Sequence, residues 1–345
     1  MTEGFALFRL PYAQECTWLS GPVSDVPSLV DLTGKSGFVL APFAPSERRG
    51  ILLIGAERVE SGISGMADFP GISRLSGISG LSGFSGGTDA ANYHVDFANF
   101  HAHLLNGDFQ KLVLSRSIDI RRTGEETPLQ LFQRACERYP RMMISLVNTP
   151  QSGLWLAATP EILLSGYQHE WQTIALAGTM KYEEGLRWSD KNIQEQRYVA
   201  TYIIRQLEQF TTDFSEEGPR TARAGHLAHL RSDFRFTLPD GVSVGEVLQA
   251  LHPTPAVCGL PKQEAFRFIL QNEHHDRSYY SGFMGPLFVD GRTNLFVTLR
   301  CMQIFADGYR LYAGGGLLKD SVEEQEWQET ETKLDTMRNI IYNNV

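Results

Sequence analysis

The 345-residue chain lacks the features that would place it in several specialised classes of protein. Its four cysteines, Cys16, Cys136, Cys258 and Cys301, show neither the close spacing of a zinc site nor a disulfide framework, so we expect reduced core residues. No apolar run is long enough to span a membrane, and the N-terminus lacks the basic flank and apolar core of a signal peptide. These absences predict a soluble, cytoplasmic protein without a membrane partner.

The chain also has no excess of positive charge. Its formal net charge is −9, which argues against a general nucleic-acid binder. Hydrophobic residues make up 42% of the sequence, enough to give one large domain or two small ones an ample core. We therefore expect neither nucleic acid nor membrane among its partners.

Residues 1–90 carry few polar clusters that indicate chemistry. Residues 38–43 and 51–55 have the composition of strands. Residues 61–87 repeat Ser-Gly pairs between apolar residues, which predicts a surface loop whose role stays open. We assign residues 1–90 to the N-terminal part of a sheet and residues 91–345 to the region that carries the chemistry, within one structural domain.

Strands and helices are interspersed through the rest of the chain. The expected strands cover residues 109–120, 142–147, 154–157, 174–178 and 295–304, and the expected helices cover residues 91–105, 127–139, 189–209 and 261–271. Asp290-Gly291 and Asp307-Gly308 are typical of hairpin turns. The pattern predicts an α+β fold with a large, mainly antiparallel sheet and helices packed outside it.

The C-terminal stretch AGGGLLKDSVEEQEWQETETK combines a glycine run with a charged helix. We expect a strand at Tyr309–Ala313, a turn at Gly314–Gly316, and a helix opened by a capping box between Ser321 and Glu324. Backbone N–H groups of a glycine-rich turn can approach an anion closely.

The same helix places Glu326, Glu329 and Lys333 at offsets of three and four, so the three side chains share one face. Two glutamates on one face can supply part of a Mg²⁺ coordination shell. A solvated face with ordinary charge pairs is the alternative that the spacing alone leaves open.

Isolated polar groups also occur within apolar segments. Lys111 lies in the expected strand 109–120, where it indicates either a site residue or a lysine that protects an edge strand. Glu195 follows an apolar helix face and needs a partner there, and Arg300, expected in mid-strand, suits a carboxylate ligand. His226 and His229 have no metal-ligand spacing, which is typical of core histidines.

Eight stretches occur in an order that resembles the chorismate-utilising enzymes. This family includes isochorismate synthase, salicylate synthase and the synthase subunits for anthranilate and aminodeoxychorismate. The stretches are FQKLVLSR, ATPEILL, ALAGT, KNIQEQRYV, LHPTPAVCGLPK, DRSYYSGFMG, VTLRC and AGGGLLKDSVEEQEWQETETK. They lie between Phe109 and Met337, about two thirds of the chain, and imply a Mg²⁺-dependent reaction on chorismate, a small dicarboxylate.

The resemblance assigns a role to each matching residue. It implies that Glu195 and Glu329 hold Mg²⁺ and that Glu326 assists through water. It also implies a substrate site made by Thr179, His229, Ala256, Tyr280, Arg300, Gly314, Gly315, Gly316 and Lys333.

Lys111 distinguishes the branches of the family, because family members that use ammonia resemble one another in having glutamine there. The resemblance implies that Lys111 removes a proton from water attacking C2 and that Glu161 protonates the departing C4 hydroxyl, giving isochorismate. A lysine acts as a base only when neutral, and a glutamic acid acts as an acid only if its pKa rises. The product would feed menaquinone or siderophore biosynthesis, and no glutaminase subunit is expected.

Three alternatives remain open. Salicylate synthases share the lysine and go on to eliminate pyruvate; a subunit that uses ammonia and a binding module without turnover are the others. Ala177 stands where aminodeoxychorismate synthases have lysine, and Ala256 is the small residue associated with isochorismate-forming members. Both residues favour isochorismate synthase.

Overall fold

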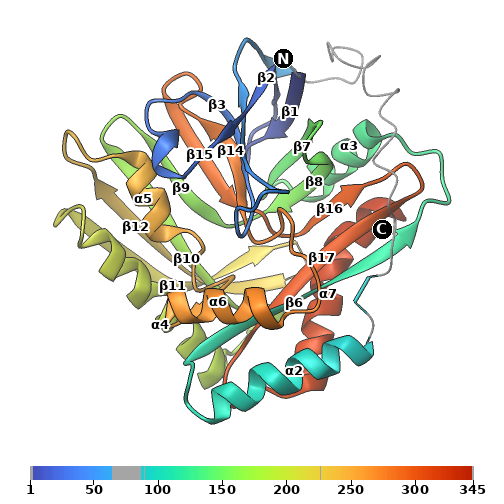
Figure 1. Ribbon diagram of the computed structural model, residues 1–345, viewed down its shortest axis with the longest axis vertical. Helices are drawn as coiled ribbons and strands as arrows, with labels where there is room; N and C mark the ends of the chain where they lie inside the picture. Colours follow the sequence, from blue (N-terminus) through green and yellow to red (C-terminus); the bar gives the residue numbers. More distant parts are fainter. Residues whose placement is uncertain (1–2, 64–86, 89, 226, 344–345) are drawn as a thin grey trace.

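The computed structural model describes residues 3–63, 87–88, 90–225 and 227–343 (Figure 1). Most of the expected loop 61–87 and His226 therefore lie outside the described residues. The strands are β1 Glu3–Arg9, β2 Cys16–Val26, β3 Gly37–Ala41, β4 Ile51–Gly55, β5 Arg58–Ile63, β6 Lys111–Arg121, β7 Met143–Thr149, β8 Gly153–Thr159, β9 Ile162–Tyr167, β10 Glu170–Lys181, β11 Phe214–Ala224, β12 Leu227–Thr237, β13 Gly259–Leu260, β14 Phe283–Leu287, β15 Arg292–Val297, β16 Cys301–Ile304 and β17 Gly308–Leu317. The helices are α2 Ala90–Leu105, α3 Pro128–Arg138, α4 Asp190–Leu207, α5 Val244–Leu251, α6 Lys262–Asn272 and α7 Glu323–Ile341, with a short 3₁₀ helix at Val30–Leu32.

The strands form two antiparallel sheets that share β2. The first sheet has the order β5-β2-β1-β7-β8-β16-β17-β6-β13. The second has the order β11-β12-β10-β9-β15-β14-β3-β4-β2. The expected α+β class with mainly antiparallel strands is confirmed.

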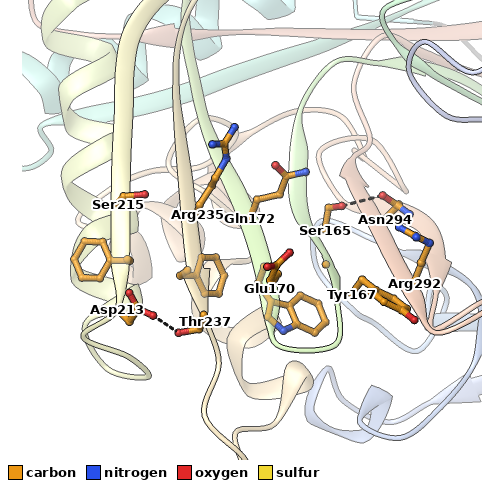
Figure 2. A pocket seen from close by; sticks show the side chains of 14 residues that line it. Ser165, Tyr167, Glu170, Gln172, Asp213, Ser215, Arg235, Thr237, Arg292 and Asn294 are labelled. Carbon is orange, nitrogen blue, oxygen red and sulfur yellow. Dashed lines mark hydrogen bonds between the residues drawn. The ribbon is translucent and has the colours of Figure 1, made fainter.

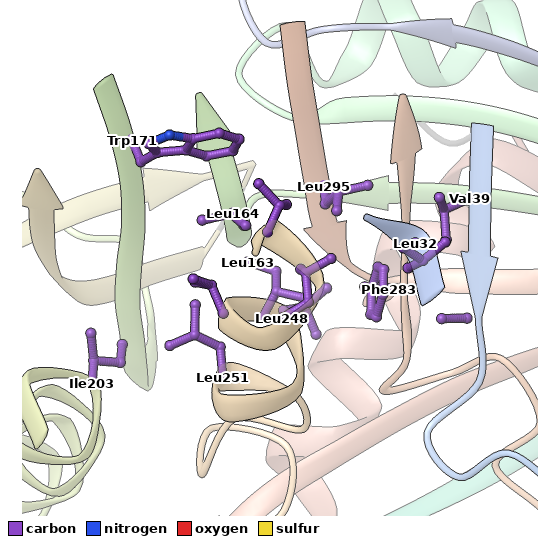
Figure 3. Packing of buried hydrophobic residues seen from close by; sticks show 14 of the residues in the cluster. Leu32, Val39, Leu163, Leu164, Trp171, Ile203, Leu248, Leu251, Phe283 and Leu295 are labelled. Carbon is purple, nitrogen blue, oxygen red and sulfur yellow. The ribbon is translucent and has the colours of Figure 1, made fainter. Parts of the chain in front are cut away.

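Successive side chains of a strand point to opposite faces of its sheet, so apolar residues can be buried on both faces. In β7, Ile144 and Leu146 pack in a cluster with α3 and α7, whereas Met143 and Val147 pack between the sheets. On the far side of the second sheet, apolar residues of α4 and α5, including Ile203 and Leu248, cover Trp171, Leu164 and Leu295 (Figure 3). The molecule is therefore layered helix, sheet, sheet, helix, with each fully buried Leu or Ile side chain contributing about 1.5–3 kcal/mol.

Several local predictions agree with the structure. The helices expected to begin near residues 127 and 189 do so, with Thr127 and Ser189 as the N-caps of α3 and α4. The hairpin between β14 and β15 turns at Asp290 and Gly291, which have φ of 51° and 73°, as a type I′ turn requires. No helix among the described residues has the length and apolar composition needed to cross a membrane.

Two predictions for the C-terminal stretch are wrong. Gly314–Gly316 are not a turn, because they extend β17 in register with Val113–Ser115 of β6. Ser321 does not cap α7, which begins at Glu323 after Val322 and has no side-chain cap. The Ser321 hydroxyl instead accepts a hydrogen bond from the amide of Leu318 at 3.0 Å, which closes the turn after β17.

Arg300 does not lie in the middle of a strand. The expected strand 295–304 divides into β15 and β16, and Arg300 lies between them with φ of 45°. β15 pairs with β9 in the second sheet and β16 pairs with β8 in the first, so the chain passes from one sheet to the other here. This crossing interrupts the alternation of faces on which the prediction depended.

The strand expected at 174–178 does not end at its glycine. β10 continues to Lys181, and its register with β12 shifts between Ala177 and Thr179. Gly178 lies at this bulge with φ of 68°, a conformation that glycine adopts readily. The bulge turns the backbone of Gly178 toward α4, where its N–H meets Glu195.

Candidate active site

A cavity between the two sheets gathers most of the residues that the sequence singled out. It is lined by Val113, Pro160, Glu161, Leu176, Ala177, Gly178, Thr179, Glu195, His229, Ala256, Val257, Tyr280, Leu299, Arg300, Gly314, Gly316 and Lys333. The other predicted residues, Lys111, Gly315, Glu326 and Glu329, lie next to the residues that line the cavity. Lys111 is paired with Glu195, and a Cβ added to Gly315 would lie close to Glu326 and Glu329. Segments separated by more than 200 residues in the chain therefore form one site.

Lys111 is completely buried at the start of β6. Its Nζ lies 2.9 Å from Oε1 of Glu195, an ion pair whose angle falls outside hydrogen-bond geometry. β6 pairs with β17 on one side and β13 on the other, so the edge-strand explanation for this lysine is wrong. Burial opposes ionisation of Glu195, but Lys111, with Lys333 and Lys191, outweighs it and holds the pKa of Glu195 below its ordinary value.

Glu161 lies in the turn between β8 and β9 and is only 2% exposed. Burial raises its pKa from 4.5 to about 8, although Lys111 and Arg300 act in the opposite direction. Its Oε1 has no hydrogen-bond partner among the described residues. Glu161 therefore keeps its proton at neutral pH, in a cavity that is also lined by Glu195, the partner of Lys111.

Arg300 and His229 form a second polar group in the cavity. Nη2 of Arg300 donates to Nε2 of His229 at 3.3 Å, and Nδ1 of His229 lies 3.1 Å from the carbonyl oxygen of Gly178 and 3.3 Å from Oγ1 of Thr179. Because arginine only donates, we assign the histidine proton to Nδ1. Burial, with Arg300 and Lys333, places the pKa of His229 well below its ordinary value, so the ring is neutral and leaves the arginine charge available to an anion.

Glu326 and Glu329 of α7 each bind a lysine. Lys333 donates to Oε1 of Glu329 at 2.6 Å and to the carbonyl oxygen of Gly314 at 2.8 Å. Glu326 pairs with Lys191 of α4. Burial and the nearby charge of Glu329 raise the pKa of Glu326. Lys191 was not among the predicted site residues, although its offset of four residues from Glu195 places both on one face of α4.

The oxygen donors of this site suit a hard divalent cation. As they stand, no three His, Cys, Asp or Glu side chains in the described ranges have an arrangement that could hold a metal ion. The lysine pairs explain this, since each of Glu195, Glu326 and Glu329 is turned toward an ammonium group. Rotation of these side chains away from their lysines would supply three carboxylates of the required chemistry.

The glycines of β17 give these side chains room. A Cβ on Gly316 would lie 2.1 Å from Oε1 of Glu195 and 2.9 Å from Cε of Lys111, and one on Gly314 would lie 2.8 Å from the hydroxyl of Tyr280. The Gly314 carbonyl faces Lys333, and the N–H of a strand residue points to the same side as its carbonyl, so this amide faces the cavity. β17 pairs with β16 only up to Tyr312, which leaves that edge open.

We expect Gly316→Ala to destabilise the protein by about 1–3 kcal/mol, because the added methyl group displaces Glu195 or Lys111 from a packed site. Gly55→Ala in β4 is the control, since its Cβ would meet Pro22 at an ordinary 3.4 Å. Urea unfolding of both variants measures the difference. Equal stabilities would show that the Lys111–Glu195 pair moves aside without cost.

A buried network of residues that no sequence motif singled out holds two walls of the cavity. Arg277 donates to the carbonyl oxygens of Val113 and Val257, both at 2.7 Å, and its guanidinium group pairs with Glu273. Glu273 also accepts from the amide and hydroxyl of Ser115. The network joins β6 to the loop before β13, so it fixes the spacing between these walls.

A larger groove, of about 580 Å³, lies over the ends of β9, β10, β11, β12 and β15 (Figure 2). It contains none of the predicted site residues. Arg235 and Arg292 on its rim are exposed, and Asp213 accepts from Thr237, as the figure shows. Its charged groups are therefore solvated, unlike Lys111 and Glu161 at the cavity between the sheets.

Two antiparallel sheets of an α+β protein enclose a buried lysine, a carboxyl group with a raised pKa and an arginine. The chain belongs to the family of chorismate binding enzymes, which matches residues 86–342. This confirms the resemblance that the sequence motifs indicated.

Characterised relatives align with about two thirds of the chain. It is 31% identical over 246 residues to the salicylate biosynthesis isochorismate synthase of Pseudomonas aeruginosa, covering 68% of this chain and 51% of that protein. It is 30% identical over 241 residues to the isochorismate synthase EntC of Escherichia coli, covering 67% and 62%. The match thus spans less than two thirds of each relative's length.

Solved structures with low sequence identity have the same fold. MenF, the menaquinone-specific isochorismate synthase of Escherichia coli, superposes with a TM-score of 0.80 at 22% identity, covering 98% of this chain and 88% of that one. Anthranilate synthase component I of Streptococcus pneumoniae has a TM-score of 0.70 at 18% identity, covering 91% and 81%. At these identities the likeness shows the fold alone.

Proposed function

We propose that the chain is an isochorismate synthase, which converts chorismate reversibly to isochorismate. The observation that carries this proposal is the placement of Lys111, paired with Glu195, and the protonated Glu161 at one cavity. The names of relatives that match two thirds of the chain support it. An acid and a base in one site suit a reaction that adds water at one carbon and removes a hydroxyl at another.

The cavity has positive groups for the two carboxylates of chorismate. Arg300 and Lys333 line it, and the amide of Gly314 faces it. An arginine can bind a carboxylate through two parallel hydrogen bonds. Tyr280, stacked on Tyr312 with ring centroids 5.7 Å apart, presents a rigid ring beside the bound substrate.

The proposed proton transfers give each of the two catalytic groups one role. Lys111 accepts a proton from a water molecule whose oxygen bonds to C2. Glu161 donates its proton to the C4 hydroxyl, which leaves as water while the ring double bonds shift. Burial keeps Glu161 protonated for this step and excludes bulk water from both groups.

We further propose that Glu195 and Glu329 would hold Mg²⁺, with Glu326 assisting through water. The ion would neutralise a substrate carboxylate, and its binding competes with the lysines that now pair with these glutamates. If Mg²⁺ binding separates Glu195 from Lys111, Lys333 and Arg300 would still place positive charge beside the substrate.

We expect Glu329→Ala to weaken the Mg²⁺ dependence of chorismate binding by at least about 10-fold. Replacing a group that only orients a metal ligand already lowers metal affinity about 10-fold or more, so removing the ligand itself should lower it at least as far. Calorimetric titration of chorismate at several Mg²⁺ concentrations measures this. Glu323→Ala is the matched control, since Glu323 lies on the same helix and pairs with the exposed His94. An unchanged Mg²⁺ titration would contradict the assignment of Glu329.

The direct test is a product assay with chorismate and Mg²⁺, read by NMR and mass spectrometry. Isochorismate without pyruvate supports the proposal. Salicylate with pyruvate would make the chain a salicylate synthase, and anthranilate or aminodeoxychorismate formed only with ammonia would assign it to the ammonia-using branch. Stabilisation by chorismate without any product would indicate a binding module.

A further inference from the structure

The fold brings together two cysteines that the sequence keeps 120 positions apart. Cys16 begins β2 and Cys136 lies in the last turn of α3; both side chains pack against one hydrophobic cluster, close enough for each thiol to shift the pKa of the other. Both are partly exposed and line a cavity of about 330 Å³. All four cysteines are free, as expected of reduced core residues, but Cys16 and Cys136 pack only partly buried against the core, whereas Cys258 and Cys301 are fully buried.

Arg9 of β1 provides a fixed positive charge at the same cavity. Its Nη2 donates to the carbonyl oxygens of Tyr139 at 2.7 Å and Met142 at 2.9 Å, so the guanidinium group cannot move freely. Its buried Nε has no hydrogen-bond partner within the described ranges. This arrangement leaves a donor and a charge available to an anion that forms on a nearby sulfur.

The two thiols have unequal environments. Interaction with the Cys136 thiol lowers the pKa of Cys16; burial opposes this effect, and the charge of Arg9 adds to it. The pKa of Cys136 is raised, first by its interaction with the Cys16 thiol and then by burial. Cys16 is thus the sulfur that ionises first, and Cys136 is the neighbour positioned to react with it.

We propose that Cys16 and Cys136 are a redox-active dithiol that peroxide converts to a reversible disulfide. The Cys16 thiolate attacks one peroxide oxygen, the O–O bond breaks, and protonation of the leaving oxygen gives water and a sulfenic acid. The Cys136 sulfur then attacks the Cys16 sulfur, the S–O bond breaks and a second water leaves. Two thiols are oxidised by two electrons and one hydrogen peroxide is reduced to two waters.

The bond would tie β2 to α3, an element that supports the helix carrying Glu329 and Lys333. Tyr139, just after α3, donates to the carbonyl oxygen of Thr336 in α7 at 3.0 Å, and Arg134 donates to that of Ile340 at 3.2 Å. A disulfide closing so long a segment restricts the unfolded chain strongly. The oxidised protein should therefore melt at a higher temperature than the reduced protein.

The test uses the full reduced chain, treated with one equivalent of hydrogen peroxide and alkylated in denaturant. We expect two of the four thiols to disappear, a peptide in which Cys16 and Cys136 are linked, a monomeric product and reversal by dithiothreitol. Linkage between chains, oxidation of Cys258 or Cys301, or four thiols remaining would overturn the proposal. These readouts use the natural sequence and do not depend on chorismate turnover.

Variants separate the two steps. Cys136→Ser should stop at a sulfenic acid that dimedone traps, and Cys16→Ser should lose the peroxide reaction at that pair. Cys258→Ala is the control and should form the disulfide as the natural chain does. A Cys16→Ser chain that loses thiols as fast as the natural chain would show that another cysteine reacts first.

Discussion

Replacing Lys111 by alanine or glutamine is expected to lower kcat for isochorismate formation by about 10²–10⁴-fold, the range for loss of a general base. Lys111 is completely buried and its Nζ lies 2.9 Å from Glu195, so no bulk water can take over its role. Glutamine keeps much of the length of the side chain but cannot accept the proton. We therefore expect the dissociation constant for chorismate, measured by calorimetry, to change far less than kcat.

Lys35→Gln is the control for this substitution, because Lys35 is exposed and distant in sequence from the residues that line the cavity. It should leave both constants unchanged. A Lys111 variant that loses chorismate binding but keeps its turnover per bound substrate would make Lys111 a binding residue and remove it from the proton transfer.

Glu161→Gln is expected to produce a second loss of about 10²–10⁴-fold in kcat, since the amide cannot give a proton to the departing hydroxyl. The natural enzyme should lose activity as pH rises through about 8, where the buried carboxyl group ionises. The residual rate of Glu161→Gln should not share this decline. Rate profiles from pH 6 to pH 9 test both points, and a decline that persists in the variant would assign it to another group.

The same substitution has a consequence for stability that needs no substrate. The pKa of Glu161 is about 8 in the fold against an ordinary 4.5, so between these values the unfolded chain releases a proton that the folded chain keeps. The contribution of this group to the free energy of unfolding is thus fully present below pH 4.5 and is lost as pH rises toward 8. The free energy of unfolding of Glu161→Gln should therefore rise relative to that of the natural chain, by on the order of 3 kcal/mol as the pH goes from 5 to 8, measured by urea unfolding.

A pH-independent difference between the two chains would contradict the raised pKa of Glu161. Glu60→Gln on the exposed strand β5 is the control, because Glu60 lies in contact with solvent and its substitution should leave the pH dependence of stability unchanged. Gln196→Glu would not serve, because it introduces a new buried charge.

Local sequence patterns predicted the elements that depend on neighbouring residues. The helix starts near residues 127 and 189 and the Asp290-Gly291 turn were predicted, and each satisfies backbone groups within a few positions. The shared face of Glu326, Glu329 and Lys333 also follows from helical spacing, and Lys333 does bind Glu329. The motif order identified the family that residues 86–342 match.

The errors occur where a residue's partner comes from elsewhere in the chain. Gly314–Gly316 suggest a turn when read alone, but β6 extends them as a strand and Glu195 of α4 requires the space that their missing side chains leave. Arg300 seemed part of one strand because the crossing between two sheets leaves no local signal. The contact of Cys16 with Cys136 depends on β2 and α3 meeting, and no spacing indicates it.

The sequence by itself determined the α+β class, the family and the residue types available for acid, base and anion binding, because these follow from local periodicity and from motifs in order. Only the tertiary structure decided which groups are charged and what each one faces. The pKa of Glu161 rises because distant strands exclude water from it, and Glu195, Glu326 and Glu329 each face a lysine because α4, β6 and α7 converge. Burial and long-range pairing are properties of the packed fold, so no stretch of sequence contains them.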